Sequence, residues 1–437
     1  MSKWKLLKHR LTGKDKNTSK IDELSIHRHN GFQFFSSKRT IFIWKDLQTY
    51  TINEDTVNNN INDKKSDWLN DLIDYYYKFM EIRDCSECCM NIEIPLKYKD
   101  ELYNFLQAGD EAKTHRFDPL EIDLINKKVK TTFYVVQNPS IILSMSECIY
   151  KKYIININTD NNNNNWEIYT REGIPDRKLT IKDITSHEDY GVDNTGNIRI
   201  WDSESILLYT LLKIEKSIFN NNKITLQQNL LLSYIKDQNI LELGGGLTAL
   251  CGLGIAATSY IKPKLIIITD GHPKCTRNLQ VCIEMNKQKQ VFNQCDINAH
   301  QLRWDRNDIK CQNEINSILN INNNIGYDTI LISDCLFFKE FHLDLIYVLN
   351  QIVRPGGRVL LLQPPRSGST ELFIKLINKN VWEINREFEE NYCEEVNEKH
   401  KKFMNEDIEK GIYDPDLHFP RLLIMIKKDN NSNIFNI

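Results

Sequence analysis

The sequence predicts an α/β protein whose main domain is a Rossmann-like sheet with helices on both faces. An apolar run, 240–243, enters the three glycines 244–246, and an apolar helical pattern follows at once. A second apolar run, 265–269, ends in Asp270. Further short apolar strands alternate with helical patterns up to the last one, 422–426. Continuous apolar strands of this kind are typical of a parallel sheet that is buried on both faces.

Length and composition fit one large domain with a smaller one. The chain has 437 residues, 41% of them hydrophobic, which supports a sizeable core. A net charge of −3 gives no overall signal for nucleic acid or membrane, and no apolar run reaches the roughly 18 residues of a membrane span. The first residues lack the apolar stretch of a signal peptide. Eleven scattered cysteines indicate reduced thiols, so we expect a protein of the cytoplasm, with the nucleus as a second compartment.

Three cysteines, Cys85, Cys88 and Cys89, lie close enough in the sequence to supply half of a zinc site. Structural zinc sites need about four ligands, commonly from two such pairs. No second Cys pair or His pair follows nearby. We therefore predict no metal.

The first twenty residues are strongly basic. They contain seven Lys or Arg residues against one Asp, a local charge of +6. Trp4, Leu7 and Leu11 fall on one helical face. A basic amphipathic helix is typical of calmodulin targets and of membrane-surface segments. The alternative is a solvated helix whose Trp4 packs on its own domain.

The remaining N-terminal region gives weaker signals. Residues 24–50 alternate between apolar and polar and predict one or two strands, and 131–156 predicts strands again. Between them, 51–130 is treated as a low-complexity insertion with one helix, 68–80. The asparagine tract within 157–165 has nothing to bury and is predicted to be disordered. The expected domains are an N-terminal region 1–189, a main domain 190–428 and a disordered tail 429–437.

From residue 190 onward, strands and helices alternate. The turn-rich segment 190–196 precedes a short strand, and Asp202 is expected to cap the helix that follows, whose apolar stripe includes Leu207 and Leu211. The expected strands are 198–201, 240–243, 265–269, 291–295, 329–333, 359–362, 381–388 and 422–426. The other expected helices are 247–260, 273–286, 340–353 and 371–379, with a charged helical excursion before the last strand.

The glycine run and the acid after the next strand predict a nucleotide-type cofactor pocket. Glycines allow a sharp turn and a close approach of ligand to backbone, and Asp270 at a strand end suits a ribose diol. As a bare pattern, Gly244-x-Gly246-x-x-Ala249 is weak, because it also fits nicotinamide dehydrogenases. Glu242, placed inside the strand to serve the polar end of the ligand, favours S-adenosylmethionine, as does the paired arrangement of the last two strands.

From about Asp193 to Lys427 the chain resembles the seven-β-strand, class I S-adenosylmethionine-dependent lysine methyltransferases. Within that family it is similar to members that act on calmodulin, whereas about 46–130 has no evident counterpart. The stretches that carry the resemblance are Asp193–Asn197 with Trp201, Glu242–Gly246, Thr269–Gly271 with Arg277–Asn278, Leu302–Asp305, Asp334–Phe337, Pro364–Arg366, Leu417–Pro420 and the N-terminal Trp4–Leu7.

The resemblance implies a cofactor site for S-adenosylmethionine within a seven-stranded methyltransferase sheet. It implies that Gly244 and Gly246 line the methionine part and that Asp270 binds the ribose hydroxyls. Trp304 is expected near the adenine ring, where stacking suits an aromatic face. Trp201 is expected to close the pocket from the preceding strand. An ordinary core position is the alternative for Trp304.

The same resemblance implies a catalytic and substrate-binding edge. Ser333 and Asp334 end the fourth strand, where open α/β sheets bind ligands, and Asp334 is expected to orient the substrate amine. Phe337 stands where relatives carry Tyr, and with Trp4 and His418 it is a candidate substrate contact. The alternatives are that Asp334 only caps the next segment and that His418 only shapes a turn.

The expected activity is methyl transfer to a lysine ε-amine of calmodulin by proximity and orientation, without a dedicated base. We expect a monomer that binds neither nucleic acid nor membrane. The rival interpretations are a lysine methyltransferase acting on another protein or on RNA, a non-catalytic calmodulin-binding module that keeps the cofactor pocket, and a nicotinamide dehydrogenase.

Overall fold

The chain divides by its contacts into two compact units, residues 1–39 with 151–437, and residues 40–150. None of the described helices is long and apolar enough to cross a membrane. The computed structural model describes residues 32–40, 49–51, 87–107, 113–117, 120–137, 148–156, 165–173, 200–292, 295–408 and 413–429. The helix expected at 68–80, the strand at 141–143 and the tail after 429 lie outside these residues.

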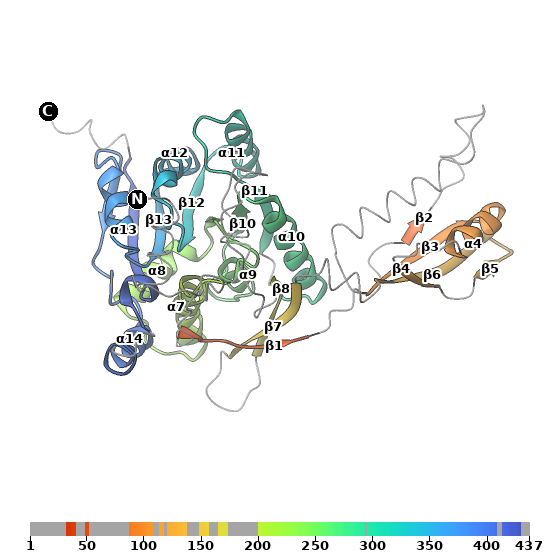
Figure 1. Ribbon diagram of the computed structural model, residues 1–437, viewed down its shortest axis with the longest axis horizontal. Helices are drawn as coiled ribbons and strands as arrows, with labels where there is room; N and C mark the ends of the chain where they lie inside the picture. The colour runs from red at the N-terminus through yellow and green to blue at the C-terminus, as the bar shows by residue number, and fades with distance from the viewer. Residues whose placement is uncertain are drawn as a thin grey trace, which may run out of the picture. The chain divides into compact units, whose positions relative to one another are not determined.

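The larger unit is built on a seven-stranded sheet in the order β11-β10-β9-β12-β13-β15-β14 (Figure 1). The first five strands of this order run parallel, and β15 is antiparallel to both of its neighbours. After β9 the chain adds strands on one side, and it then returns to add β12 on the other side. The strands are β9 Asn239–Leu243, β10 Leu265–Asp270, β11 Asp296–Gln301, β12 Tyr327–Ser333, β13 Val353–Gln363, β14 Trp382–Asn385 and β15 Arg421–Lys427.

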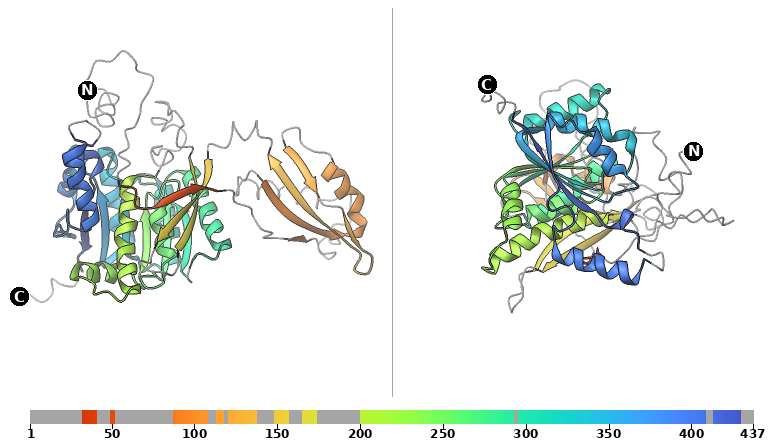
Figure 2. Two further views of the ribbon diagram at one scale, coloured as in Figure 1. Left: turned by 90° about the horizontal axis from the view of Figure 1, so that it is seen from below. Right: turned by 90° about the vertical axis from the view of Figure 1, so that its left-hand side faces the viewer.

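Helices cover both faces of this sheet (Figure 2). One hydrophobic core contains side chains of helices α7 to α10, and the other contains side chains of helices α11 to α13. The first set is α7 Asp202–Phe219, α8 Leu226–Ile235, α9 Leu250–Ala256 and α10 Pro273–Gln288. The second set is α11 Ile309–Ile321, α12 His342–Ile352 after the 3₁₀ turn η4 Lys339–Phe341, and α13 Ser369–Leu376. Helices α14 Glu394–Glu406 and α15 Pro415–His418 lie between β14 and β15.

The strand residues alternate between the two cores. Ile240 packs into the first core and Leu241 into the second, because successive side chains of a strand point to opposite faces. Both side chains are fully buried. The continuous apolar character of the central strands therefore follows from burial on two sides.

A second, three-stranded sheet of the larger unit packs on α10. Its order is β1-β7-β8, with β1 Ser36–Arg39, β7 Cys148–Asn156 and β8 Asn165–Gly173. The amide of Asn286 on α10 accepts from the N–H of Tyr169 at 2.9 Å and donates to its carbonyl at 2.7 Å. A side-chain amide thus satisfies the backbone of β8 at this point.

The smaller unit has its own sheet, in the order β2-β3-β6-β4, with β5 paired to β6. Its buried residues include Ile94, Leu102 and Val129. The elements are β2 Thr49–Thr51, β3 Glu87–Pro95, the 3₁₀ turn η2 Leu96–Tyr98, α4 Lys99–Gln107, β4 Lys113–Phe117, β5 Glu121–Asp123 and β6 Lys128–Gln137.

The predicted fold class is confirmed by the seven-stranded mixed sheet between two layers of helices. The strands expected at 265–269, 329–333 and 422–426 are present, within two residues at each end. The prediction of a strand at 291–295 was wrong. The strand in this part of the chain is Asp296–Gln301. Among the described strands it pairs only with β10, and it carries polar residues, so its apolar signal is weak.

Two expectations before α7 were also wrong. Asp202 is the first residue of the helix, and Trp201 occupies the N-cap position without a side-chain hydrogen bond. Ile200 and Trp201 are not in a strand. Helices α8 and α11 were not predicted, although each starts with a recognisable cap: Thr225 and Gln228 form a capping box, and Asp308 accepts from the N–H of Lys310.

Candidate active site

Three functional positions lie level with one another at the carboxyl edge of the parallel strands. In the register, Leu243 of β9 is opposite Thr269 of β10 on one side and Ile332 of β12 on the other. The next residue along each strand is Gly244, Asp270 and Ser333, respectively. The strand order reverses between β9 and β12, which is where open α/β sheets bind ligands.

The glycine loop has a backbone that side chains would disturb. Gly244 and Gly246 have φ angles of +69° and +60°, in the left-handed region that favours glycine. A Cβ atom on Gly244 would lie 2.6 Å from Sγ of Cys335 and 3.5 Å from the ring of Trp304. The N–H of Gly245 donates to the carbonyl of Thr269 at 2.9 Å. The loop is therefore fixed to β10, and its packing against Cys335 and Trp304 leaves no room for a side chain at Gly244.

Asp270 holds this loop from the neighbouring strand. Its Oδ2 accepts from the N–H of Gly246 at 2.9 Å, and its Oδ1 accepts from the N–H of His272 at 2.8 Å. The acid expected to bind the ribose thus also organises the loop beside it.

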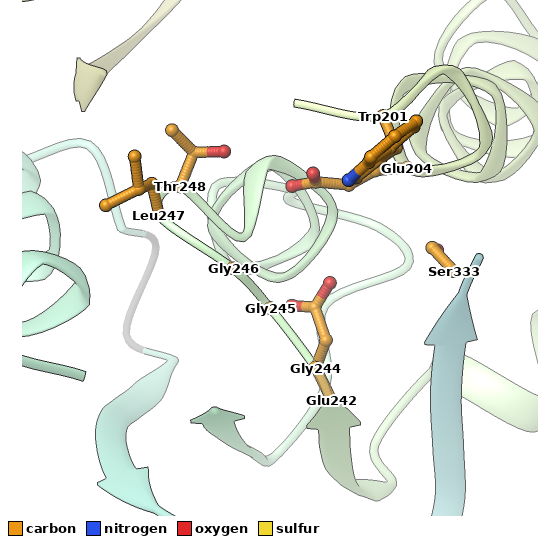
Figure 3. Close-up of a pocket in the computed structure, with 9 residues that line it drawn as sticks. All are labelled: Trp201, Glu204, Glu242, Gly244, Gly245, Gly246, Leu247, Thr248 and Ser333. Carbon is orange, nitrogen blue, oxygen red and sulfur yellow. The ribbon is translucent and has the colours of Figure 1, made fainter. Parts of the chain in front are cut away.

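A pocket opens above the loop (Figure 3). Trp201 and Glu204 extend from the start of α7, Glu242 from the end of β9, and Ser333 marks the end of β12. The lining residues are Trp201, Glu204, Glu242, Gly244, Gly245, Gly246, Leu247, Thr248 and Ser333. Five residues expected at the cofactor, namely Trp201, Glu242, Gly244, Gly246 and Ser333, therefore share one pocket.

Two buried carboxyl groups, Glu204 and Glu242, stand together in this lining. Glu204 accepts from the N–H of Leu250, and Oε2 of Glu242 accepts from the N–H of Gly252 at 3.0 Å. Within the described part of the chain, neither group has an ion-pair partner. Burial raises the pKa of Glu242 to about 7. Burial and then the charge of Glu242 raise the pKa of Glu204 well above its ordinary value.

Trp304 lies at the other side of the glycine loop, with its ring beside Gly244. The indole Nε1 is buried and has no hydrogen-bond partner among the described residues. Buried donors are nearly always paired in folded proteins. An unpaired donor beside an open loop is a position where a ligand acceptor would fit.

Asp334 follows β12 in a left-handed conformation, with φ of +58°. Its Oδ1 accepts from Nε2 of Gln363 at 2.9 Å and from Nε of Arg366 at 3.0 Å. Its Oδ2 accepts from Nη2 of Arg366. The carboxylate is therefore held by a forked guanidinium.

The candidate substrate contacts lie in three different settings. The Phe337 ring is buried, with the Arg366 guanidinium 5.3 Å from its centroid. His418 stacks on Tyr413 at 5.7 Å, and its Nδ1 accepts from the N–H of Asp414 at 2.9 Å. This places His418 at the end of α15, just before β15. Trp4 lies outside the described residues.

Sequence reasoning missed two side chains of this site, Glu204 and Arg366. Glu204 shares a helical face with Leu208 and Leu211, at spacings of four and seven, so a carboxyl group on a buried stripe was the available signal. Arg366 was noticed only as part of a motif. Its partner, Asp334, is thirty-two residues away in the sequence, and no spacing rule connects the two.

A nucleotide-cofactor transferase is the class that this fold and site define. The sheet order, the glycine loop after β9 and the acid after β10 belong to one arrangement. Residues 178–380 match the family model described as lysine methyltransferase. This part of the chain is therefore similar to the lysine methyltransferase family.

The chain is also similar to individual proteins. The chain is 28% identical over 245 residues to the calmodulin-lysine N-methyltransferase of Arabidopsis thaliana, which covers 56% of this chain and 69% of that protein. Among solved structures, it is similar to an S-adenosyl-L-methionine-dependent methyltransferase of Methanococcus maripaludis, with 16% identity, TM-score 0.25, and coverage of 52% and 90%. It is also similar to a phosphoethanolamine N-methyltransferase of Haemonchus contortus in complex with S-adenosylhomocysteine. That comparison has 11% identity, a TM-score of 0.27, and coverage of 78% of this chain and 77% of that chain. We draw no conclusion from structural likenesses this distant.

The cofactor of this family is S-adenosylmethionine, and the residues present fit it. The unpaired Nε1 of Trp304 offers a donor, and the glycines 244–246 line the pocket with backbone alone. The carboxyl groups of Glu204 and Glu242 offer an acidic lining. A ligand with both a nucleoside and a cationic amino-acid part suits these three features together.

Proposed function

We propose that this enzyme transfers methyl groups from S-adenosylmethionine to a lysine ε-amine of calmodulin. The observation that carries the substrate is the similarity to the Arabidopsis thaliana calmodulin-lysine N-methyltransferase, at 28% identity over 69% of that protein. The family match at 178–380 supports the lysine as acceptor.

The proposed roles follow from the pocket and its edge. The glycine loop and Asp270 would hold the nucleoside part, and Glu204 with Glu242 would hold the amino-acid part. When bound, the cofactor supplies an already activated methyl group on its sulfonium. The chain's own task is to align a neutral amine with it. Free lysine has a pKa of about 10.4, so a proton must leave first, and burial at the site favours that loss.

Asp334 is the proposed contact for the substrate amine. It follows Ser333, which lines the pocket, and it stands next to the turn that carries Cys335 and Phe337. A carboxylate there can accept a hydrogen bond from the amine and fix its direction. No general base is required, because water can take the proton before transfer.

The basic N-terminal segment is the proposed docking element for calmodulin, which is an acidic protein. Residues 1–20 carry a local charge of +6 together with Trp4. Attraction between opposite charges weakens as salt is raised. Deleting 2–20 is expected to raise the Michaelis constant for calmodulin more than it lowers turnover, and an unchanged constant would remove the segment from substrate binding. We further propose that the protein acts as a monomer in the cytoplasm, with the nucleus as a second compartment.

The direct test is intact-mass analysis of calmodulin after incubation with the purified chain and labelled S-adenosylmethionine. A mass increase by whole methyl groups, mapped to one lysine, is the expected result. Gly244→Ala, whose Cβ would meet Sγ of Cys335, serves as the inactive control. Unmodified calmodulin together with labelled lysine in other proteins would transfer the proposal to a different substrate of the same family.

A further inference from the structure

Two aspartate–arginine pairs stand at opposite ends of β12. Asp328 near its start accepts from Nε of Arg354 at 2.5 Å. Asp334 just after its end accepts from Arg366 through two N–H groups. Only the second pair lies at the carboxyl edge with the pocket. Its side chains are 4% and 8% exposed, against 15% and 33% for the first pair.

The guanidinium of Arg366 lies near two aromatic rings as well as the carboxylate. Its carbon is 5.5 Å from the centroid of Trp201 and 5.3 Å from that of Phe337. Contacts of this length are within the range of cation–π attraction. Because Trp201 lines the cofactor pocket, Arg366 connects the wall of that pocket with Asp334.

The backbone around Arg366 is also fixed. Arg366 and Ser367 have φ of +50° and +52°, which is an uncommon conformation for residues with side chains. The carbonyl of Asp416 accepts from the N–H of Arg366 at 3.0 Å, and its Oδ2 accepts from the N–H of Ser367 at 2.6 Å. Helix α15 therefore supports the loop at the residue that holds Asp334.

The Asp334 carboxylate has one lone-pair position without a hydrogen bond from the described residues. A carboxylate has roughly four lone-pair positions, and three hydrogen bonds are made, two from Arg366 and one from Gln363. One position on Oδ2 remains for a substrate N–H group. The direction of that position is set by the fork, because both oxygens are engaged by Arg366.

Charge gives a second consequence. A lone carboxylate beside the target lysine would favour its ammonium form, which cannot accept a methyl group. A carboxylate that is already neutralised by a guanidinium does not favour the ammonium form of the lysine. The positive guanidinium itself disfavours a second cation nearby. Arginine stays protonated throughout. Other ionisable groups on surrounding described elements include Asp416 on α15, Lys339 on η4, Glu204 on α7, Glu242 on β9, His342 on α12 and the thiol of the neighbouring Cys335.

We propose that Arg366 is a positioning residue for methyl transfer, which aims the Asp334 carboxylate at the substrate nitrogen and cancels its charge, so that lysine is received as the free amine. This inference rests on the proposed lysine methylation but not on calmodulin being the substrate. Arg366 itself does not touch the reacting atoms in this scheme.

The test compares the pH dependence of methyl transfer in Arg366→Gln, Arg366→Lys and Asp334→Asn with the wild type. Arg366→Gln leaves an unneutralised carboxylate, so the midpoint of the rising limb of kcat/KM should move up by about one pH unit. Asp334→Asn leaves an unneutralised guanidinium, so the midpoint should move down. Arg366→Lys keeps the charge but loses the fork, so it should keep the midpoint and lose turnover about tenfold or more.

Binding of S-adenosylhomocysteine separates positioning from damage to the fold. All three variants are expected to bind it within about threefold of the wild type, because their cofactor contacts remain. The matched control is Arg354→Gln at the other end of β12, which should lower the melting temperature without moving the pH midpoint. An unchanged midpoint in both Arg366→Gln and Asp334→Asn overturns the proposal, as does loss of activity that only follows loss of cofactor binding.

The assay contains calmodulin and, in parallel, unmodified cell protein, and label is scored on lysine. Label on the cell protein but not on calmodulin contradicts the proposed substrate. The comparison of the three variants is then made on that label, so it still decides the role of Arg366.

Discussion

The main-chain N–H of Gly246 donates to Oδ2 of Asp270 at 2.9 Å, which joins the loop after β9 directly to the acid after β10. The two residues are twenty-four positions apart in the sequence. Parallel register brings them together, because Leu243 and Thr269, one residue before Gly244 and Asp270, are partners. The acid therefore holds the N–H of Gly246 and that of His272 from one fixed position.

Replacing Asp270 by Asn is expected to weaken S-adenosylhomocysteine binding by about tenfold or more, because hydrogen bonds to a charged acceptor contribute about 1.5–3 kcal/mol. The amide nitrogen cannot accept, so the N–H of either Gly246 or His272 loses its partner. Isothermal titration measures the change. Asp328→Asn is the control, since Asp328 also accepts from a main-chain N–H, that of Asn239 at 2.8 Å, but at the opposite edge. Equal affinity losses in both variants would contradict a local role.

Gly244→Ala is expected to abolish measurable cofactor binding. Its Cβ would lie 2.6 Å from Sγ of Cys335, and the residue would keep an unfavourable φ of +69°. Gly356→Ala isolates the strain, because Gly356 has the same φ and its Cβ would meet nothing closer than 3.4 Å. Both variants should melt at lower temperature by thermal scanning, but only Gly244→Ala should lose S-adenosylhomocysteine. Binding that survives in Gly244→Ala would show that the loop can move aside.

The central part of this fold was predictable for a physical reason. Strands such as β10 and β12 are buried on both faces, so their residues are apolar throughout and each run ends where the sheet ends. The residue after each run then marks the functional edge. Asp270 and Ser333 could be placed at that edge from the sequence alone, before any contact was known.

The parts that were missed depend on contacts that a single sequence does not reveal. Strand β8 lies in an asparagine-rich segment, and its backbone is bound by the side chain of Asn286 more than a hundred residues away. Strand β11 lies at the edge of the sheet and includes polar residues, so its apolar signal is weak. Glu204 and Arg366 acquire their roles only from their partners, Glu242 and Asp334.

Trp304→Phe is expected to leave the free protein at least as stable and to weaken S-adenosylhomocysteine binding about fivefold, the value of one ordinary hydrogen bond. The substitution keeps the ring and removes an Nε1–H that has no partner among the described residues. Trp382→Phe is the matched control, because its Nε1 donates to Oδ1 of Asn350 at 2.8 Å. That variant should lose stability and keep affinity. Unchanged affinity in Trp304→Phe would mean that the donor does not meet the cofactor.

Glu204 and Glu242 make the stability of the folded chain depend on pH in a direction opposite to most acids. Both have pKa values raised by burial, Glu242 to about 7, above the ordinary Glu value of 4.5. The folded chain therefore holds protons that the unfolded chain has released. Their contribution to stability is complete below the ordinary value and is lost as pH rises through the raised pKa of about 7.

Glu204→Gln should reduce the fall in melting temperature between about pH 5 and pH 8, because one proton-binding group is removed. Its amide can donate to the Glu242 carboxylate while its oxygen still accepts from the N–H of Leu250. Glu215→Gln on the same helix is the control. Glu215 is 1% exposed and accepts from the N–H groups of Ser259, Tyr260 and Ile261 at 2.8–3.1 Å, so the amide should lower the melting temperature at every pH. A wild-type melting temperature that rises from about pH 5 to pH 8, with the same slope in Glu204→Gln, would contradict the raised pKa values of these two acids.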